Sequence, residues 1–332
     1  MSERKPLLYT FVGYDRGYLK LLAVFLLSLK QSQISPWAFD LLLIIDPSFE
    51  VETYELLDKL QISAKVWCKS TQTIMESSCL RLHIFSWPEI TKYSRAIYLD
   101  TDILVTAPLT SLFTTPLDKK LYALQQGNIG NTGFGFDFFD FSKISYNTPG
   151  INTGTSMFPI CQEIHQLFLE CLAFIQQHIA AKKPMPPCAE QPFVNYIVVS
   201  KNMQSTNIFN GIATAHPEGE KETKALSHFA MPIGDWKSKW TRMIEYISKV
   251  SVFPELRAEG QKIAWTKEET CLSFLPNGIL QTHWGQGTWT QKGNLLQASW
   301  HGFTHYIIFV DQKNYFSFRV KDGVMQAGWI VQ

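Results

Sequence analysis

Apolar segments of two kinds alternate along the first third of the chain. Short runs rich in Leu, Ile, Val and Phe have the length of buried strands, and longer segments repeat apolar side chains at helical spacing. Strands are predicted at residues 7–12, 39–45, 64–67 and 95–105, and helices at residues 18–30, 52–60 and 75–85. Strands that alternate with helices predict an α/β domain with a mostly parallel sheet, whose ligands bind at the carboxyl ends of the strands.

The predicted strand at residues 95–105 carries two carboxylates, Asp100 and Asp102, within an apolar run. Residues two apart on a strand face the same side, so both can meet one cation if the extended geometry persists. Mg²⁺ and Mn²⁺ prefer oxygen ligands of this kind. For the Asp-x-Asp motif taken alone, the alternative to a metal site is a turn in which the Asp side chains hydrogen-bond only to the backbone. The apolar neighbours indicate that the two carboxylates are buried. This favours a metal site, because burying a charged carboxylate costs free energy unless a cation or hydrogen-bond donors compensate it.

Polar residues also interrupt later apolar segments. Asn152 and Gly154 break a strand-like segment at residues 150–158, where Gly marks a close approach and Asn can bond hydroxyls. A bulge with a turn Asn is the open alternative. Glu190 and Gln191 begin a helix-like segment, where helix capping alone would also explain the Glu.

A short predicted strand at residues 225–229 delivers His228, and Gly234 and Lys237 follow it, before a helix predicted at about residues 239–249. A lone His is more often a hydrogen-bonded structural residue, and a lone Lys is usually solvated. Their position after a predicted metal-binding strand favours a metal ligand and a phosphate clamp instead.

Beyond residue 262 the pattern changes to short β segments separated by Gly and Asn turns. We therefore predict an α/β domain at residues 1–262 and a small all-β accessory module at residues 263–332. Trp284, Trp289 and Trp300 of this module fit either carbohydrate binding or a small aromatic core.

Composition narrows the functional classes. With 30 basic and 29 acidic residues the net charge is +1, which does not favour a nucleic-acid partner or an anionic membrane. The 6 cysteines are scattered without metal-binding spacing, as expected for reduced thiols. No segment has the features of a secretory signal or a transmembrane helix, so we expect a cytoplasmic protein.

Several motifs occur together in a fixed order. They are Leu-Arg-Leu-His-Ile-Phe-Ser-Trp at residues 80–87, Tyr-Ser-Arg-Ala-Ile-Tyr-Leu-Asp-Thr-Asp at 93–102, Asn-Thr-Gly at 152–154, Glu-Gln at 190–191, His-Phe at 228–229 and Gly-Asp-Trp-Lys at 234–237. With this ordered set, the chain up to about residue 250 resembles glycosyltransferase family 8, the glycogenin-like retaining transferases with a GT-A fold. The resemblance implies a mixed, mostly parallel GT-A sheet flanked by helices.

The resemblance also implies a nucleotide-sugar donor, UDP-sugar, and a metal cofactor, Mn²⁺, with Mg²⁺ possible. The implied metal ligands are Asp100, Asp102 and His228. The residues implied to contact the nucleotide-sugar donor are Thr10 and Tyr18 at the base or ribose, Arg81 beside the sugar, and Gly234 and Lys237 at the diphosphate. The implied sugar-pocket residues are Asn152, Glu190 and Gln191. Two departures stand out. Glu190 occupies a position where the family usually has Asp, and the spacing from His228 to Gly234 is longer than in glycogenin.

The expected activity is that of a hexosyltransferase that moves a sugar, with UDP-glucose favoured, to a glycan, protein or small-molecule acceptor. A catalytically inactive carbohydrate-binding protein on the same fold is the alternative. A nucleotidyltransferase is disfavoured because residues 13–17 are a poor match to a Gly-rich phosphate loop that carries Lys or Arg.

Overall fold

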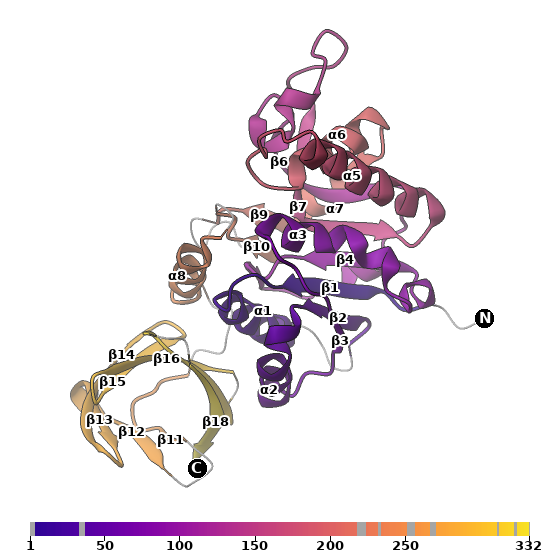
Figure 1. The fold of residues 1–332 in the computed structure, drawn as a ribbon. Coiled ribbons are helices and arrows are strands. Elements are labelled where there is room, and N and C mark those ends of the chain that lie inside the picture. The colour runs from indigo at the N-terminus through magenta and orange to yellow at the C-terminus, as the bar shows by residue number, and fades with distance from the viewer. Residues whose placement is uncertain are drawn as a thin grey trace.

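The structure is a computed structural model and describes residues 4–32, 37–217, 224–231, 234–250, 256–265, 270–310, 312–321 and 324–331. Its N-terminal part is a layered α/β unit, and its C-terminal part is an all-β module beside α2 and α8 (Figure 1). The helices are α1 (Tyr18–Ser32), α2 (Glu50–Leu60), α3 (Ile74–Cys79), α4 (Thr110–Thr114), α5 (Gln162–Ala180), α6 (Gln191–Ser200), α7 (Asn207–Ile212) and α8 (Trp236–Ile247). Short 3₁₀ helices are η1 (Pro47–Phe49), η2 (Leu80–Ser86), η3 (Ile90–Lys92), η4 (Thr132–Phe134), η5 (Phe136–Phe138) and η7 (Pro276–Gly278).

The main sheet has the strand order β3-β2-β1-β4-β7-β6-β8. Its strands are β1 (Leu7–Val12), β2 (Asp40–Ile45), β3 (Lys65–Cys68), β4 (Arg95–Leu99), β6 (Leu121–Asn128), β7 (Pro149–Pro159) and β8 (Gln204–Ser205). The pairs β3-β2, β2-β1, β1-β4 and β6-β8 are parallel, whereas β7 runs antiparallel to both β4 and β6. The predicted mixed, mostly parallel sheet is confirmed.

Helices cover both faces of this sheet. Leu8 and Leu43 belong to one hydrophobic cluster together with α1, α2 and α8. The neighbouring residues Tyr9 and Ile44 belong to a second cluster together with η2, α5 and α6. Successive strand residues point to opposite faces, so strands buried on both sides must be apolar throughout. This explains the continuous apolar runs of the sequence.

The predicted helix at residues 75–85 is two elements in the structure. The Thr73 side chain caps α3 by accepting a hydrogen bond from Glu76 N at 3.1 Å, and α3 ends at Cys79. The chain continues as the 3₁₀ helix η2, which buries Leu80, Leu82 and Ile84 against the sheet. The tighter winding changes which side chains face the sheet. It leaves the intervening Arg81 free to point elsewhere.

The predicted strand at residues 95–105 is also interrupted. β4 ends at Leu99, and β5 (Ile103–Val105) belongs to a separate sheet with β9 (Ala213–Ala215) and β10 (Leu226–His228). Asp100 N donates to Gly154 O at 2.8 Å, whereas Phe229 N donates to Asp102 O at 2.9 Å. Asp100 is thus bonded to β7 and Asp102 to the residue that follows β10, and the two aspartates lie at a turn. The prediction that one continuous strand carries both carboxylates is wrong.

The C-terminal module is a closed sheet of antiparallel strands in which β11 pairs with both β12 and β18. Its strands are β11 (Lys262–Ala264), β12 (Cys271–Leu275), β13 (Ile279–Thr282), β14 (Gly285–Lys292), β15 (Leu295–Trp300), β16 (Phe303–Phe309), β17 (Asn314–Arg319) and β18 (Met325–Val331). Leu272, Phe274 and Leu296 contribute to its own core. Ile308, together with other residues of β16 and β17, belongs instead to the cluster that contains α1 and α8. The module therefore shares a core with the α/β unit.

The tryptophans of this module lie in different environments. Trp300 is buried and its ring stacks on His305, with 4.6 Å between centroids. Trp289 Nε1 donates to the carbonyls of Leu275 and Ile279. Trp284 is 42% exposed. Trp300 and Trp289 thus serve packing and internal hydrogen bonding, in agreement with the aromatic-core interpretation.

Two further expectations concern the chain as a whole. Of the 6 cysteines, which were expected to be reduced and mostly buried, only Cys79 and Cys171 are buried, and no disulfide joins any two of these described residues. Among the described helices, none has the length and apolar character needed to cross a bilayer. The division of the chain at residue 262 stays a prediction.

Candidate active site

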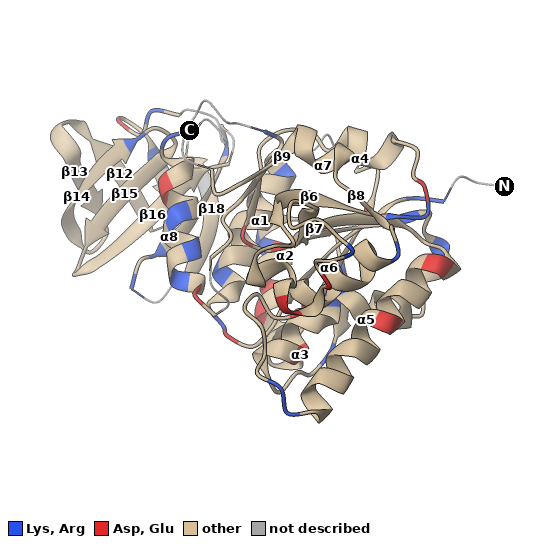
Figure 2. Cartoon of the chain, turned by 90° about the horizontal axis from the view of Figure 1, so that it is seen from above, with Lys and Arg blue, Asp and Glu red and all other residues tan. Residues whose placement is uncertain are grey.

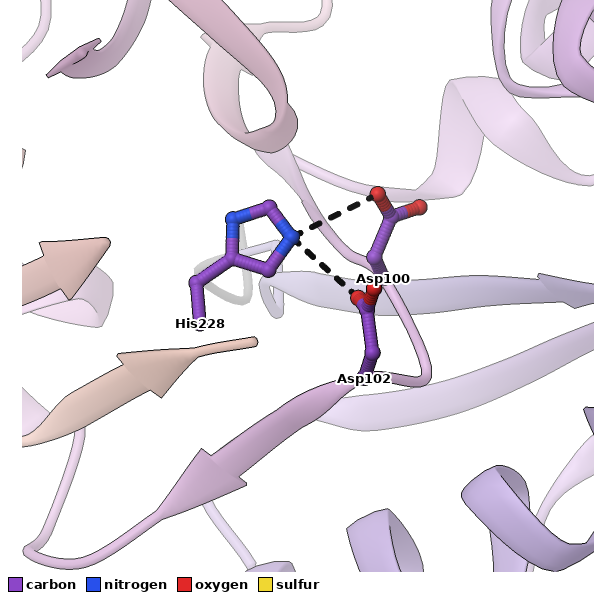
Figure 3. A group of neighbouring side chains, drawn as sticks. All are labelled: Asp100, Asp102 and His228. Atoms are coloured by element: carbon purple, nitrogen blue, oxygen red, sulfur yellow. Dashed lines mark ion pairs between the residues drawn. The ribbon is translucent and has the colours of Figure 1, made fainter. Parts of the chain in front are cut away.

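Three side chains able to ligate a metal meet where β4, β5 and β10 approach one another (Figure 3). Asp100 and Asp102 come from the turn between β4 and β5, and His228 ends β10. His228 Nε2 lies 3.9 Å from Asp100 Oδ2 and 3.2 Å from Asp102 Oδ1. Asp102 and His228 are each only 2% exposed. The fold thus brings the predicted metal ligands together from segments far apart in sequence.

An irregularity in β7 makes room for this cluster. The register with β6 shifts from the pair Ala123 and Ser156 to the pair Leu124 and Asn152, so the residues between them on β7 bulge. Among these, Gly154 lies against the ligands: a Cβ there would overlap Asp100 Oδ2 and lie 2.9 Å from His228 Cε1. Gly is required because of this close approach.

Lys239 supplies a positive charge beside Asp102. Basic positions recur along α8 (Figure 2), and Lys239 Nζ lies 2.8 Å from Asp102 Oδ2. Burial alone would raise the pKa of Asp102, but Lys239 and His228 outweigh it and hold that pKa well below its usual range. Asp102 is therefore a carboxylate at neutral pH.

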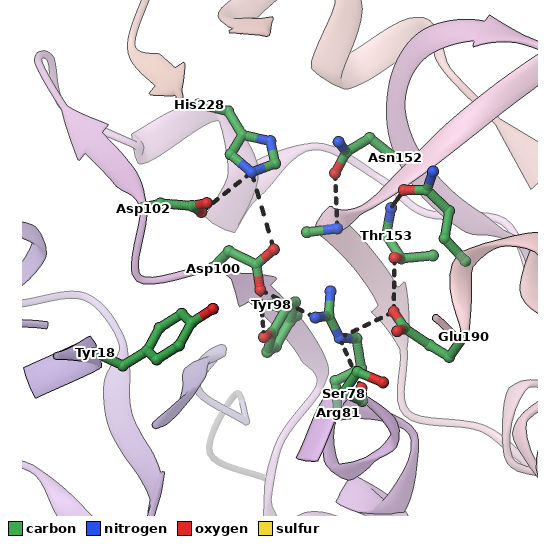
Figure 4. A network of polar contacts seen from close by, with 12 residues as sticks. Tyr18, Ser78, Arg81, Tyr98, Asp100, Asp102, Asn152, Thr153, Glu190 and His228 are labelled. Atoms are coloured by element: carbon green, nitrogen blue, oxygen red, sulfur yellow. Dashed lines mark hydrogen bonds and ion pairs between the residues drawn. The ribbon is translucent and has the colours of Figure 1, made fainter. Parts of the chain in front are cut away.

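Arg81 links the metal cluster to a second acidic residue (Figure 4). Its Nη2 lies 3.2 Å from Asp100 Oδ1, and its Nε lies 3.3 Å from Glu190 Oε1. The guanidinium also lies over the Tyr98 ring, 4.5 Å from the centroid, and the Tyr98 hydroxyl donates to Asp100 Oδ1 at 2.6 Å. Asp100 is thus oriented from two sides.

Glu190 and Gln191 are held by the bulged part of β7. Thr153 Oγ1 donates to Glu190 Oε1 at 2.8 Å, and Thr153 N donates to Gln191 Oε1 at 3.2 Å. Gln191 Nε2 donates in turn to Gly133 O at 2.9 Å. Burial raises the pKa of Glu190, while Arg81 and Thr153 act in the opposite direction. The longer Glu side chain at this position therefore ends in an ion pair and a hydrogen bond.

These groups line one cavity of about 820 Å³, a volume within the range of about 300–1,000 Å³ usual for small-molecule sites. The predicted site residues that line it are Tyr18, Arg81, Asp100, Asp102, Asn152, Glu190, Gln191 and His228. Gly234 does not line it, but its N–H donates to the Tyr18 hydroxyl at 3.1 Å.

Two further residues predicted to contact the nucleotide-sugar donor do not line the cavity. Thr10 is completely buried within β1 and does not line the cavity. Lys237 is exposed, with its Nζ 5.7 Å from the centroid of the Trp236 ring. Because α8 begins at Trp236, Lys237 and Lys239 are separated by about 200° around the helix axis, and only Lys239 faces the carboxylates.

Sequence reasoning missed five residues that line the cavity. They are Tyr98, Gln126, Thr153, His216 and Lys239. A helical pattern was available for Lys239, since it shares one stripe of α8 with apolar residues. The stripe consists of Lys239, Trp240, Met243, Ile244 and Ile247. The other four carry no comparable local signal, because their proximity arises from chain segments distant in sequence.

The donor set suits a hard divalent ion. Two carboxylates and an imidazole offer one ligand atom each, and these atoms lie within 4.8 Å of one another. Among the described residues, neither oxygen of the buried Asp102 has a hydrogen bond of good geometry, so both depend on nearby charge. Oxygen and imidazole ligands of this kind fit Mn²⁺ or Mg²⁺, and the small Gly154 leaves the ligands accessible.

Known proteins share sequence and structural features with this chain. The model of the family described as "Glycosyl transferase family 8" matches residues 9–230. A search of curated proteins gave no match. One similar solved structure is the apo form of WbbM, a bifunctional glycosyltransferase, with 14% identity and a TM-score of 0.54. The match covers 74% of this chain and 50% of that chain, so this chain spans about half the length of WbbM. At this identity the likeness shows a shared fold alone.

Proposed function

Because this chain belongs to glycosyl transferase family 8, we propose that it transfers a hexose, with UDP-glucose favoured, from a UDP-sugar to an acceptor hydroxyl with retention of configuration. The observation that carries the proposal is the cluster of Asp100, Asp102 and His228 in a cavity that also contains Arg81 and Lys239. The cavity therefore presents both negative and positive side chains, as a metal-bound diphosphate and a sugar would require.

Asp100, Asp102 and His228 would hold Mn²⁺, or Mg²⁺ in its place. The bound ion would supply Lewis-acid neutralisation of the charge that develops on the departing diphosphate. Tyr98 and Arg81 orient Asp100 for this role, and Lys239 keeps Asp102 ionised.

Lys239, rather than the exposed Lys237, is the lysine proposed to contact the diphosphate. It is nearly buried, it lines the cavity, and its Nζ lies 5.8 Å from the centroid of the Tyr18 ring. A charge held in place before the reaction stabilises the leaving group without reorganisation. Tyr18 also lines the cavity, which supports a contact with the nucleotide, whereas the buried Thr10 has no part in this proposal.

The opposite wall is proposed to bind the sugar. Asn152, Glu190 and Gln191 line it, and Arg81 reaches both Glu190 and the metal cluster. Carboxylate and amide oxygens near the anomeric carbon would stabilise the positive charge of an oxocarbenium-like transition state. Hydrogen bonds from Thr153 hold the Glu190 carboxylate and the Gln191 amide oxygen in place during this step.

A UDP-release assay tests the proposal. The purified protein is incubated with a panel of UDP-sugars and Mn²⁺, with and without a chelator. We expect chelator-sensitive release that is greatest with UDP-glucose. Asp102→Asn removes one ligand charge and should lower kcat/KM by about a hundredfold or more, as for other losses of electrostatic stabilisation in active sites.

Asp58→Asn is the matched control, because Asp58 is exposed on α2 and should leave turnover unchanged. Melting temperatures of both variants show whether a loss of activity reflects unfolding. The proposal would be wrong if the folded wild-type protein neither bound nor cleaved any UDP-sugar with Mn²⁺. Glycan binding that is unchanged by Asp102→Asn and accompanied by no transfer would support a binding protein instead.

A further inference from the structure

A chain of hydrogen bonds runs along the sugar side of the cavity away from the metal cluster. Gly154 N donates to Asn152 Oδ1 at 2.7 Å. Asn152 Nδ2 donates to Gln126 Oε1, and Gln126 Nε2 lies 2.9 Å from His216 Nε2. Asn152, Gln126 and His216 all line the cavity. The last two have no role in the mechanism described above.

The direction of every bond in this chain follows from its first member. A backbone N–H can only donate, so the group of Asn152 that faces Gly154 must be its oxygen. The Asn152 amide nitrogen then faces Gln126, which must present its own oxygen. Gln126 consequently presents its NH₂ group to His216, so His216 Nε2 must accept. His216 is thereby required to be neutral, with its proton on Nδ1.

Gln126 and His216 both occupy irregular backbone. The register between β6 and β7 shifts between Gln125 and Gly127, which leaves Gln126 at a bulge. Bulges of this kind redirect a side chain and are frequent beside active sites. His216 follows β9 with a φ of 53°, a left-handed conformation that is uncommon for residues other than Gly. Its N–H donates to His228 O at 2.8 Å, which anchors it to the strand of a metal ligand.

We propose that Gln126 and His216 are positioning residues for the donor sugar, acting through Asn152. With the Asn152 oxygen bonded to Gly154 and one amide hydrogen bonded to Gln126, the second amide hydrogen is left for a sugar hydroxyl. A site built to donate to a particular hydroxyl discriminates against sugars that lack it there. The proposal rests on the proposed function, since it assumes that Asn152 contacts the sugar of a UDP-sugar.

Paired binding measurements test the positioning role. The affinities for UDP and for UDP-glucose are measured with Mn²⁺ by calorimetry for the wild type and for Gln126→Ala. The variant should bind UDP as the wild type does but UDP-glucose about three- to tenfold more weakly, the effect of roughly one hydrogen bond. Gln125→Ala is the matched control, because Gln125 is exposed, does not line the cavity and bonds with Asn210.

Two substitutions of His216 separate hydrogen bonding from packing. His216→Gln can present an oxygen to Gln126 and should retain the affinity for UDP-glucose, whereas His216→Leu cannot accept and should show the same loss as Gln126→Ala. Equal weakening of UDP and UDP-glucose in Gln126→Ala, or no weakening of either, would overturn the positioning role alone. Absence of binding of both ligands to the folded wild type would overturn the proposed function.

The bond directions have a test that needs no turnover and no donor. Nitrogen-15 NMR of the histidine rings, recorded with Mg²⁺ and assigned with His216→Gln, reports which ring nitrogen carries the proton. We expect His216 protonated at Nδ1 in the wild type. Gln126→Glu replaces the donor by an acceptor and should move the proton to Nε2. A wild-type ring protonated at Nε2 would contradict the inferred chain.

Discussion

At the scale of single residues, the site is a balance of opposite charges in a confined space. Asp100, Asp102 and Glu190 provide negative charge, and Arg81 and Lys239 provide positive charge, joined by the contacts described above. Three carboxylates against two cations leave one negative charge in excess. Addition of a divalent cation would turn this excess into a positive charge. The site would then attract a nucleotide diphosphate, because complementary charge favours such ligands.

Gly154→Ala tests how closely the backbone must approach the ligands. The added Cβ would overlap Asp100 Oδ2, so we expect the affinity for Mn²⁺ to fall by about ten- to a hundredfold, as for other disturbances of ligand orientation. Calorimetric titration with Mn²⁺ measures this. Gly211→Ala on α7 is the control, since in the described part of the chain nothing beyond its chain neighbours and its own helix backbone lies within 4 Å of the added Cβ. Unchanged Mn²⁺ affinity in Gly154→Ala would contradict the metal site.

At the scale of elements, the position of a helix start decides which lysine serves the site. Sequence patterns indicated a helix from about residue 239, which left Lys237 in the preceding loop. In the structure, Asp235 caps α8 by accepting from Ser238 N at 3.1 Å, and the helix begins at Trp236. Lys237 is then exposed, and Lys239 is directed to Asp102. A shift of the helix start by three residues therefore exchanges one candidate for the other.

The two lysines can be compared directly. Lys239→Met keeps much of the side-chain volume but removes the charge, and it should lower kcat/KM for UDP-sugar by about a hundredfold. Lys237→Met should change kcat/KM by less than about twofold, because an exposed lysine contributes little. Steady-state UDP release measures both. A larger loss in Lys237→Met than in Lys239→Met would contradict the assignment.

At the scale of the whole molecule, the C-terminal module is joined to the α/β unit by a common core. The Trp240 ring on α8 packs against Tyr306 of β16 and Phe318 of β17, with centroid distances of 6.1 and 6.2 Å. The same helix carries Lys239 on its buried side. Contacts that support the module therefore also support the helix that supplies a cation to the active site.

This arrangement predicts that the two parts unfold together. Trp240→Ala should lower the free energy of unfolding by about 3–5 kcal/mol, the usual effect of removing a buried aromatic ring. Trp284→Ala is the control, because Trp284 is 42% exposed and should change stability by no more than about 0.5 kcal/mol. Denaturant unfolding followed by circular dichroism measures both. Two separate wild-type transitions, or an unchanged Trp240→Ala, would contradict the common core.

The sequence by itself determined the α/β class, the family, the general alternation of strands and helices in the first third of the chain, and eight of the side chains that line the cavity. These features depend on local periodicity and on short motifs such as the one containing Asp100 and Asp102, which neighbouring residues suffice to specify.

Only the tertiary structure decided where the strand carrying those aspartates ends, which lysine faces them, and which residues support Asn152. Arg81 meets Glu190, and Gln126 meets His216, although each pair is far apart along the chain. Such contacts arise when separate elements pack and their buried polar groups must find partners. No local pattern in the sequence carries that information.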